Sequence, residues 1–452
     1  MITECARKIV LLVHYFPPIN SSGGKRMEAM AKYFARSGRD VVVITTRKSE
    51  SDGEFTEAAP PNVKVIELDV FGRTTKSVRS RVPNKTVALD EKTLKRRIKN
   101  FVMRWLGQVP DPRLPWAAAL AYPRLSPEVK GALSSANIIV ATCPPWPPLL
   151  AAVLAKKRYK KPIVLDYRDQ LSMCHEMPGG RFAKALELRL DHFLCHRADA
   201  LVTISEPMAQ YYSTFKKPVA VVLNGYDPEP LALAKAVSPW RPRSDGKPLV
   251  LRYLGLVSEG RIPRGLLKAL DSAIQQGSVA PEAVKFEYYG EARLMHRFLQ
   301  QKHPLLVGMF LFHQRVSYAR AMELAVSADH LLFCENGVPP LPGEDQSAKG
   351  ILTTKLFEYL ASGRPVLAHI SPQTLAGSFI VRASCRHFVS ESAADFGKLL
   401  QAPEFWNPSP VEEGPFVRTL SRASQADGYL QVLDAVAAGE PLSQRGHTNM
   451  VL

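Results

Sequence analysis

A short segment in the second half of the chain places a carboxylate where it could bind a sugar. Thr353 and Thr354 precede an apolar helical pattern that ends at Gly363, and Glu358 falls about one turn inside that helix. A threonine can cap a helix, and a glycine commonly ends one. From this position the carboxylate could accept two hydrogen bonds from a vicinal diol such as a ribose. The alternative is an ion pair with Lys355 on the same helix face.

Two adjacent glycines stand where a phosphate could approach the backbone. Gly23 and Gly24 follow an apolar strand pattern and precede an amphipathic helix pattern over 25–37. The N–H groups at a helix N-terminus carry partial positive charge, and glycine lets an anion come close to them. Loop glycines are more often simple turn formers, and the dinucleotide-binding spacing Gly-x-Gly-x-x-Gly does not occur at this loop. The pair therefore indicates phosphate only weakly.

The histidines and cysteines do not form a metal-ligand pattern. His192 and His196 lie one helical turn apart beside Cys195, but no third ligand follows at the spacing of a zinc site. The six cysteines include no Cys-x-x-Cys pair, which favours reduced thiols over a disulfide framework. We expect no metal site and a cytoplasmic location.

Composition indicates a folded, basic protein. Of the 452 residues, 46% are apolar and 22% charged, which is enough for two or three cores. The formal net charge of +17 favours an anionic partner. The longest apolar stretch falls far short of the roughly 20 residues that a membrane-spanning helix needs. The apolar run 9–13 lacks the cleavage site of a signal peptide, so we expect a first strand there.

Strand and helix patterns alternate along most of the chain. This alternation predicts an α/β fold class, with parallel sheets covered by helices on both faces. A Pro-rich stretch at 228–248 separates the two halves and predicts two Rossmann-like domains facing each other across a cleft. The expected strands are 8–13, 41–45, 63–68, 138–141, 163–166, 200–204 and 219–223 in the first half, and 249–254, 284–289, 310–314, 330–333, 365–369 and 387–389 in the second.

A basic insertion at about 71–109 breaks this alternation. Between Arg73 and Arg104 it holds eleven Lys or Arg against two acidic residues, which is +9 of the net +17. Apolar residues recur at helical spacing over 94–106, and basic residues occupy most of the remaining positions. Such a helix either packs on its own domain or lies on an anionic membrane surface.

Several segments together resemble the family 4 glycosyltransferases of the GT-B fold, in the family's order. The most specific is KLFEYLASGRPV at 355–366. The looser ones are YFPP at 15–18 with the glycines at 23–24, DYRD at 166–169, TISE at 203–206, NGYD at 224–227 and AD at 328–329. The resemblance covers roughly residues 8–435. It implies retaining transfer of a sugar from a nucleotide diphosphate sugar to an acceptor hydroxyl, with no metal or other cofactor.

The resemblance also implies a domain organisation. Residues 1–228 would form the acceptor-side domain, with the basic insertion, and residues 229–414 the domain that binds the nucleotide sugar. A C-terminal helix over 415–438 would cross back to the first domain, ahead of a flexible tail at 439–452. The two domains would close on the donor and expel water.

Individual positions take implied roles. Glu358 matches the residue that holds the donor ribose, Arg261 the cation facing the phosphates, and Val316 a residue lining the nucleobase pocket. Asp169 falls near the acceptor-side polar group. Candidates for a catalytic role are Asp169, Arg261 and Glu358, and candidates for donor binding are Gly23, Gly24, Arg261, Arg264, Val316, Thr353, Thr354 and Glu358.

Two positions depart from the family pattern. Gly350 stands where many members have a glutamate that contacts the transferred sugar, and Leu256 replaces the first arginine of the phosphate pair. The acidic residues at 344–345 could substitute for the glutamate, and Arg264 could supply the missing charge. These departures keep open a scaffold that binds a nucleotide sugar without transferring it.

The leading hypothesis is a cytoplasmic enzyme of cell-surface polysaccharide or glycolipid assembly. Its acceptor would be lipid-linked or otherwise amphiphilic, and residues 94–106 would hold it peripherally at the inner membrane face. We expect front-face attack by the acceptor hydroxyl; double displacement would need a carboxylate such as Asp169 or Glu206. A nucleic-acid-binding protein is the third alternative, but no nucleic-acid-binding module is recognisable, and we expect no nucleic acid partner.

Overall fold

The structure is a computed structural model, and it describes residues 7–19, 21, 23–48, 57–69, 74–75, 109, 111–120, 126–172, 180–244, 246–335, 350–442 and 450–451. The expected helix over 94–106 and the acidic pair at 344–345 lie outside these residues. The chain forms two compact units, Met1–Leu223 with Glu344–Gly350 and Arg422–Leu452, and Asn224–Gly343 with Ile351–Ser421. The division thus follows Leu223, slightly before the expected boundary at residue 228.

The first unit contains a nine-stranded sheet in the order β15-β8-β7-β6-β5-β1-β2-β3-β4. Seven of its strands are parallel and match the expected ones; the two-residue edge strands β4 and β15 are antiparallel and were not expected. The bounds are β1 Lys8–Val13, β2 Asp40–Thr46, β3 Val63–Leu68, β4 Thr74–Thr75, β5 Ile138–Cys143, β6 Ile163–Tyr167, β7 Ala200–Thr203, β8 Val219–Val221 and β15 Met450–Val451.

Helices cover both faces of this sheet because successive residues of a parallel buried strand point to opposite sides. Along β1, Ile9 and Leu11 belong to one apolar cluster and Val10 and Leu12 to another. The helices of this unit are α1 Lys25–Arg36, α3 Leu114–Ala119, α4 Pro127–Ser135, α5 Pro147–Tyr159, α6 Arg181–Arg197, α7 Glu206–Ser213 and α18 Arg422–Ala438.

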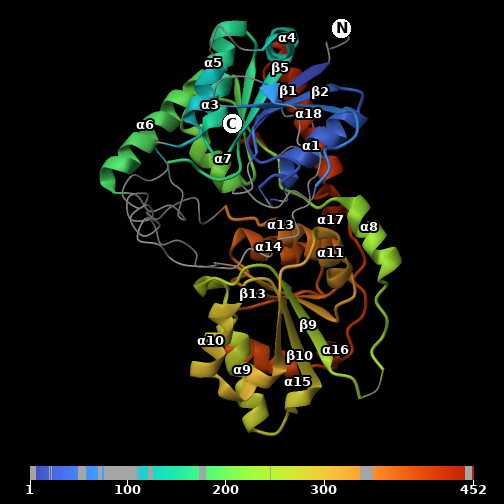
Figure 1. Cartoon of the computed structure of the whole chain (residues 1–452). Helices are drawn as coiled ribbons and strands as arrows, with labels where there is room; N and C mark the ends of the chain where they lie inside the picture. Colours follow the sequence, from blue (N-terminus) through green and yellow to red (C-terminus); the bar gives the residue numbers. More distant parts are fainter. Residues whose placement is uncertain are drawn as a thin grey trace. The chain divides into compact units, whose positions relative to one another are not determined.

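The C-terminal segment returns to the first unit, but not as one helix. Residues 415–419 form α17 within the second unit, and α18 then packs beside α1 in the first (Figure 1). The contact includes the rings of Phe34 and Tyr429, whose centroids lie 5.6 Å apart. The expected helix over 415–438 is therefore interrupted at Leu420 and Ser421, where Ser421 makes a β-bridge with Tyr226.

The second unit contains a six-stranded parallel sheet in the order β11-β10-β9-β12-β13-β14. Its strands are β9 Leu249–Leu254, β10 Val284–Tyr289, β11 Phe310–His313, β12 His330–Cys334, β13 Val366–His369 and β14 Phe388–Val389. Its helices are α8 Pro228–Val237, α9 Arg264–Gln275, α10 Arg293–Lys302, α11 Tyr318–Val326, α13 Thr354–Ala361, α14 Leu375–Ala383, α15 Ala393–Gln401, α16 Pro403–Trp406 and α17 Pro415–Thr419, with the 3-10 helices η2 Glu259–Arg261, η3 Pro281–Ala283 and η4 Pro304–Met309.

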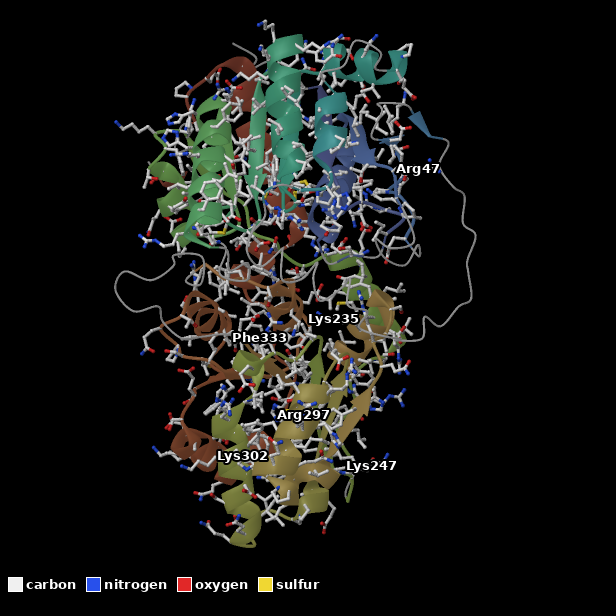
Figure 2. All side chains as sticks on the ribbon, turned by 60° about the vertical axis from the view of Figure 1, so that its left-hand side comes forward. Arg47, Lys235, Lys247, Arg297, Lys302 and Phe333 are labelled. Carbon is white, nitrogen blue, oxygen red and sulfur yellow. The ribbon has the colours of Figure 1, made fainter. Side chains whose placement is uncertain are left out.

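In this unit, a strand side chain is buried and charged side chains outside the strands are exposed. Phe333 of β12 is buried in the second unit, whereas Lys247, Arg297 and Lys302 are exposed (Figure 2).

The predicted α/β architecture with two Rossmann-like sheets is confirmed, and each of the thirteen expected strands forms within two residues of its predicted ends. Among the described helices, none has the length and apolar character needed to cross a bilayer.

The strand order of each sheet defines a place for a ligand. The order reverses between β1 and β5 in the first sheet, and between β9 and β12 in the second. Loops leaving two such strands turn to opposite faces of the sheet and leave room at its carboxyl edge, where α/β proteins bind ligands. The loops after these four strands therefore form the candidate ligand sites of the two sheets.

Candidate functional site

At the carboxyl edge of the second sheet, two glycines bring the chain ends of β9 and β10 together. Gly255 and Gly290 have φ angles of +135° and +134°, which side chains rarely allow. A Cβ on Gly290 would stand 2.6 Å from the carbonyl oxygen of Gly255, and one on Gly255 would stand 2.9 Å from Nζ of Lys355. Glycine is therefore required at both positions, and it leaves the side chain of Lys355 packed against bare backbone.

An ion pair joins the two strands at the switch point. Nε of Arg261, in η2 after β9, donates to Oε1 of Glu335 at 2.6 Å, directly after β12. Glu335 is buried, and its Oε2 has no hydrogen-bond partner among the residues that the structure describes. The predicted phosphate cation Arg261 is thus held at the switch point by a carboxylate that the sequence did not single out.

Lys355 adds a second cation to this edge. It lies in the first turn of α13, and its Nζ is 4.1 Å from the ring centroid of Tyr253. Burial lowers the pKa of the Lys355 amine to about 8, although the carboxylates of Glu335 and Glu358 act in the opposite direction. The sequence suggested Lys355 only as an ion-pair partner for Glu358; its place beside Arg261 depends on which loops meet at this edge.

Glu358 is buried one turn further along α13, and it lies close enough to Lys355 to favour the charged amine. The same helix places the two predicted threonines at its start: Thr353 is the N-cap residue and Thr354 begins the helix. The Thr353 hydroxyl makes no capping hydrogen bond, and its Oγ1 is buried without a partner among the described residues. Arg261, Lys355 and Glu358 therefore form one cluster with Glu335. We call these four residues the switch-point cluster.

The other predicted donor residues lie outside this cluster. Arg264 pairs with the exposed Glu259 and lies over the ring of Phe298, at 4.6 Å from its centroid. The half-buried Val316 stands just before Ser317, whose hydroxyl caps α11. Val316 follows β11, the edge strand, which lies two strands away from β9 in the sheet. Val316 is therefore at the same carboxyl edge as the switch-point cluster.

An aromatic pair lies between the switch-point cluster and Val316. Tyr289 and His313 are the last residues of β10 and β11, and their rings stack with centroids 4.4 Å apart. Each strand pattern predicted the strand, but only the register of the two strands makes the residues neighbours. The pair offers a flat surface on which a base could stack.

In the first unit, the predicted glycines lie beside a buried arginine. Gly24 is the N-cap residue of α1, and the carbonyl oxygen of Gly23 accepts a hydrogen bond from the Arg168 guanidinium, which also donates to the carbonyl of Pro144. Burial lowers the pKa of Arg168, and the carboxylate of exposed Asp169 opposes this. Arg168 thus connects the loops after β1, β5 and β6. The DYRD segment contained it, but the sequence pattern assigned it no role.

Near the loops after β1, β5 and β6, a buried ion pair holds α1 against the sheet. Nη2 of Arg26 lies 2.9 Å from Oδ2 of Asp166, and Nη1 of Arg26 donates to the carbonyl of Leu223 at 2.7 Å. Both side chains are buried. The pair holds the start of α1 to β6 and to the end of the first unit.

The two departures from the family pattern have different surroundings. A Cβ on Gly350 would stand 2.4 Å from Oγ of Ser205, so a glutamate here would require the Ser205 side chain to move. Leu256 is 54% exposed after β9. His192 and His196 lie exposed on α6 with Nε2 atoms 3.1 Å apart, and no group of three or more potential metal ligands occurs among the described residues.

Two doubly wound sheets, each with its own switch point, place the chain in the GT-B fold class. It superposes on sucrose-phosphate synthase from Thermosynechococcus elongatus with a TM-score of 0.53, at 12% identity over 96% of this chain and 97% of that one. HepE from Anabaena, in complex with UDP, gives 0.50 at 13% identity over 96% and 98%. A glycosyltransferase from Rickettsia africae gives 0.50 at 13% identity over 95% and 98%.

Residues 23–225 match the family model of the glycosyl transferase 4-like domain. Over this segment, which is slightly less than half of the chain, the protein is similar to that family, and the chain as a whole has the GT-B fold. No protein with a curated description matches it in sequence.

Proposed function

We propose that the protein is a retaining, metal-independent glycosyltransferase that transfers a sugar from a nucleotide diphosphate sugar to an acceptor hydroxyl. The observation that carries this proposal is the switch-point cluster, in which Arg261 and Lys355 bring two cations to the carboxyl edge of the second sheet. Cations fixed where charge develops stabilise a departing diphosphate. HepE was crystallised with UDP, which makes uridine diphosphate the first ligand to test.

The chain offers a group for each part of the nucleoside diphosphate of such a donor. Arg261 and Lys355 would neutralise the diphosphate, and Lys355 would replace the cation that Leu256 does not provide. Arg264 is less suited to this role because it lies outside the switch-point cluster, over the ring of Phe298. The Glu358 carboxylate would accept hydrogen bonds from the ribose diol.

Two further groups complete the donor site in this proposal. The backbone amides at Thr353 and Thr354 begin α13 and would meet the diphosphate. The nucleobase would lie near Val316, with the stacked rings of Tyr289 and His313 as its flat support.

Transfer would proceed by front-face attack of the acceptor hydroxyl, with a leaving phosphate oxygen taking its proton. Asp169, exposed beside Arg168 in the first unit, would orient the acceptor. Double displacement is the alternative, and Glu206 is its other carboxylate candidate. Burial raises the pKa of Glu206, and its Oε2 has no hydrogen-bond partner among the described residues.

We further propose that the acceptor is lipid-linked or otherwise amphiphilic, in cell-surface polysaccharide or glycolipid assembly. The basic segment 94–106 supports this part, since its pattern suits the anionic inner face of the cytoplasmic membrane. A cytoplasmic protein held peripherally at that face would meet both a soluble donor and a lipid acceptor.

The test combines binding with turnover. Isothermal titration with UDP and GDP, with and without EDTA, should show one nucleotide binding independently of divalent metal. Glu358→Gln should weaken that binding at least about tenfold, since a ribose hydrogen bond to a charged group is worth roughly 1.5–3 kcal/mol. Glu404→Gln, on the exposed start of α16, is the matched control and should bind as the parent protein does.

Turnover then separates the enzyme from its closest alternative. The tight packing at Gly350 and the exposed Leu256 favour a scaffold that binds a nucleotide sugar without transferring it. Release of UDP or GDP from the preferred nucleotide sugar, abolished by Glu358→Gln, supports the enzyme. Tight binding without release of product in the presence of lipid-linked acceptors supports the scaffold.

A further inference from the structure

Helix α6 buries two carboxylates and exposes large apolar side chains. Its carboxylates Glu187 and Asp191 are completely buried, whereas Phe182 is 82% exposed. A surface helix of a water-soluble domain normally turns its apolar side inward. The Glu187 carboxylate pairs with Lys184 at 3.2 Å, and that of Asp191 accepts a hydrogen bond from Ser172, so the fold itself compensates the buried carboxylates. The exposed phenylalanine has no such compensation, and exposed apolar residues that gather in a patch indicate a binding surface.

Three of the exposed apolar residues share one face of the helix. Phe182, Leu186 and Phe193 are spaced by four and seven residues, which places them along a single line about 16 Å long. Leu186 and Phe193 are each 38% exposed. Of the ten exposed large apolar side chains among the described residues, four lie on α6, counting Leu188.

The charges on the exposed side of α6 are all positive. Arg181, Arg189 and Arg197 are exposed, while both acidic residues of the helix face inward. The guanidinium of Arg197 lies over the ring of Phe193, 3.8 Å from its centroid. The exposed face therefore combines an apolar line with a cationic border.

From these observations we infer that α6 binds the surface of an anionic lipid bilayer. An interfacial helix lays its apolar side about 5–10 Å into the headgroup boundary and keeps its cations at the level of the lipid phosphates. Figure 1 shows α6, in green, at the outer margin of the first unit, and its main helix contact is with α5. A second copy of this face suits it less, because a symmetric pairing would bring three arginines of each copy together.

This inference is independent of the proposed sugar chemistry and of residues 94–106. It assigns lipid binding to side chains of α6, and the assay needs neither donor nor acceptor. Failure of the transfer assay would leave it untouched. A parent protein that does not bind anionic vesicles would contradict both this inference and the membrane part of the proposed function, but not the proposed sugar transfer.

The test is co-sedimentation of the full chain with phosphatidylcholine vesicles and with 3:1 phosphatidylcholine:phosphatidylglycerol vesicles. The parent protein should bind the anionic vesicles, and more weakly at high salt. The triple variant Phe182→Ser, Leu186→Ser, Phe193→Ser should lower the partition coefficient about tenfold or more, since it removes most of the apolar area available for insertion.

A matched control removes exposed apolar residues elsewhere. Leu233→Ser, Val237→Ser and Leu305→Ser change side chains of the second unit that are 53–64% exposed. This triple variant should bind vesicles as the parent protein does. Circular dichroism melting curves should show that both triple variants fold, because every substituted side chain faces solvent.

If the α6 triple variant fails to fold, the double variant Arg189→Glu, Arg197→Glu provides the same test through charge. It should bind anionic vesicles more weakly than the parent protein does. The inference is overturned if the parent protein does not bind anionic vesicles, or if the folded α6 variants bind them as well as the parent does. It is also overturned if the apolar variant instead changes the mass measured by light scattering, which would make this face a contact between copies of the chain.

Discussion

The charge state of Lys355 gives the sharpest test of the switch-point cluster. Burial lowers the pKa of its amine from 10.5 to about 8. A diphosphate favours the charged amine, so its binding is linked to protonation of Lys355. The affinity should therefore be full below about pH 7 and should decrease as the pH rises through 8.

The size of the effect follows from the pKa. At pH 9 only about a tenth of the amines remain protonated, so the Kd for UDP should increase about tenfold between pH 7 and pH 9, or about 1.4 kcal/mol. Isothermal titration at half-unit pH steps measures this slope. Lys355→Arg should keep tight binding across the range, because guanidinium remains charged.

Two further variants isolate the amine. Lys355→Met should bind weakly at every pH and show no decrease near pH 8. Lys302→Met, which changes an exposed lysine of α10, should follow the parent protein. If Lys355→Met keeps the same pH slope, Lys355 does not contact the diphosphate. If affinity does not decrease until above pH 10, burial does not lower the pKa of the Lys355 amine.

Three other variants test the packing near the carboxyl edges of the two sheets, with the free energy of unfolding measured in urea. Gly290→Ala should lower the free energy of unfolding by about 1–3 kcal/mol, because its Cβ would press on the Gly255 carbonyl at a positive φ. Arg26→Met should cost about 3–5 kcal/mol, since it leaves the buried Asp166 carboxylate without its cation. Burial raises the pKa of Asp191 from 3.8 to about 6, so ionisation costs about 2 kcal/mol of stability as the pH rises from 4 to 6, and Asp191→Asn should remove this dependence.

For each of these variants, one result would contradict the prediction. Gly308→Ala is the control for the glycine, because nothing lies within 4 Å of its Cβ; equal effects at both glycines would show that crowding at Gly290 is unimportant. A loss below 1 kcal/mol in Arg26→Met would mean that Asp166 finds another partner. An unchanged pH slope in Asp191→Asn would place that titration elsewhere.

The sequence alone determined the strands and the fold class. Runs such as KIVLLV at 8–13 are continuous and β-branched because both faces of a parallel sheet are buried, and this pattern is local in the chain. Local signals also predicted α13: Thr353 precedes it, and Gly363, with a φ of +80°, follows its end. The two-residue strands β4 and β15 carry too little pattern to be found this way.

Tertiary structure decided which side chains meet. Lys355 and Arg261 are separated by more than ninety residues, and they become neighbours only because β9 and β12 are adjacent in the sheet. The same holds for Arg168 and the carbonyl of Gly23. Spacing along the chain predicts neighbours within a helix or strand, but contacts between loops depend on strand order.

Tertiary structure also decided which face of a helix is buried. The sequence of α6 carries apolar residues on several sides, so its pattern does not reveal that Glu187 and Asp191 face inward and Phe182 outward. The buried side of α6 includes a site where the Asp191 carboxylate accepts a hydrogen bond from Ser172, nineteen residues earlier. Such a partner stabilises a buried polar group, and it comes from another element of the fold.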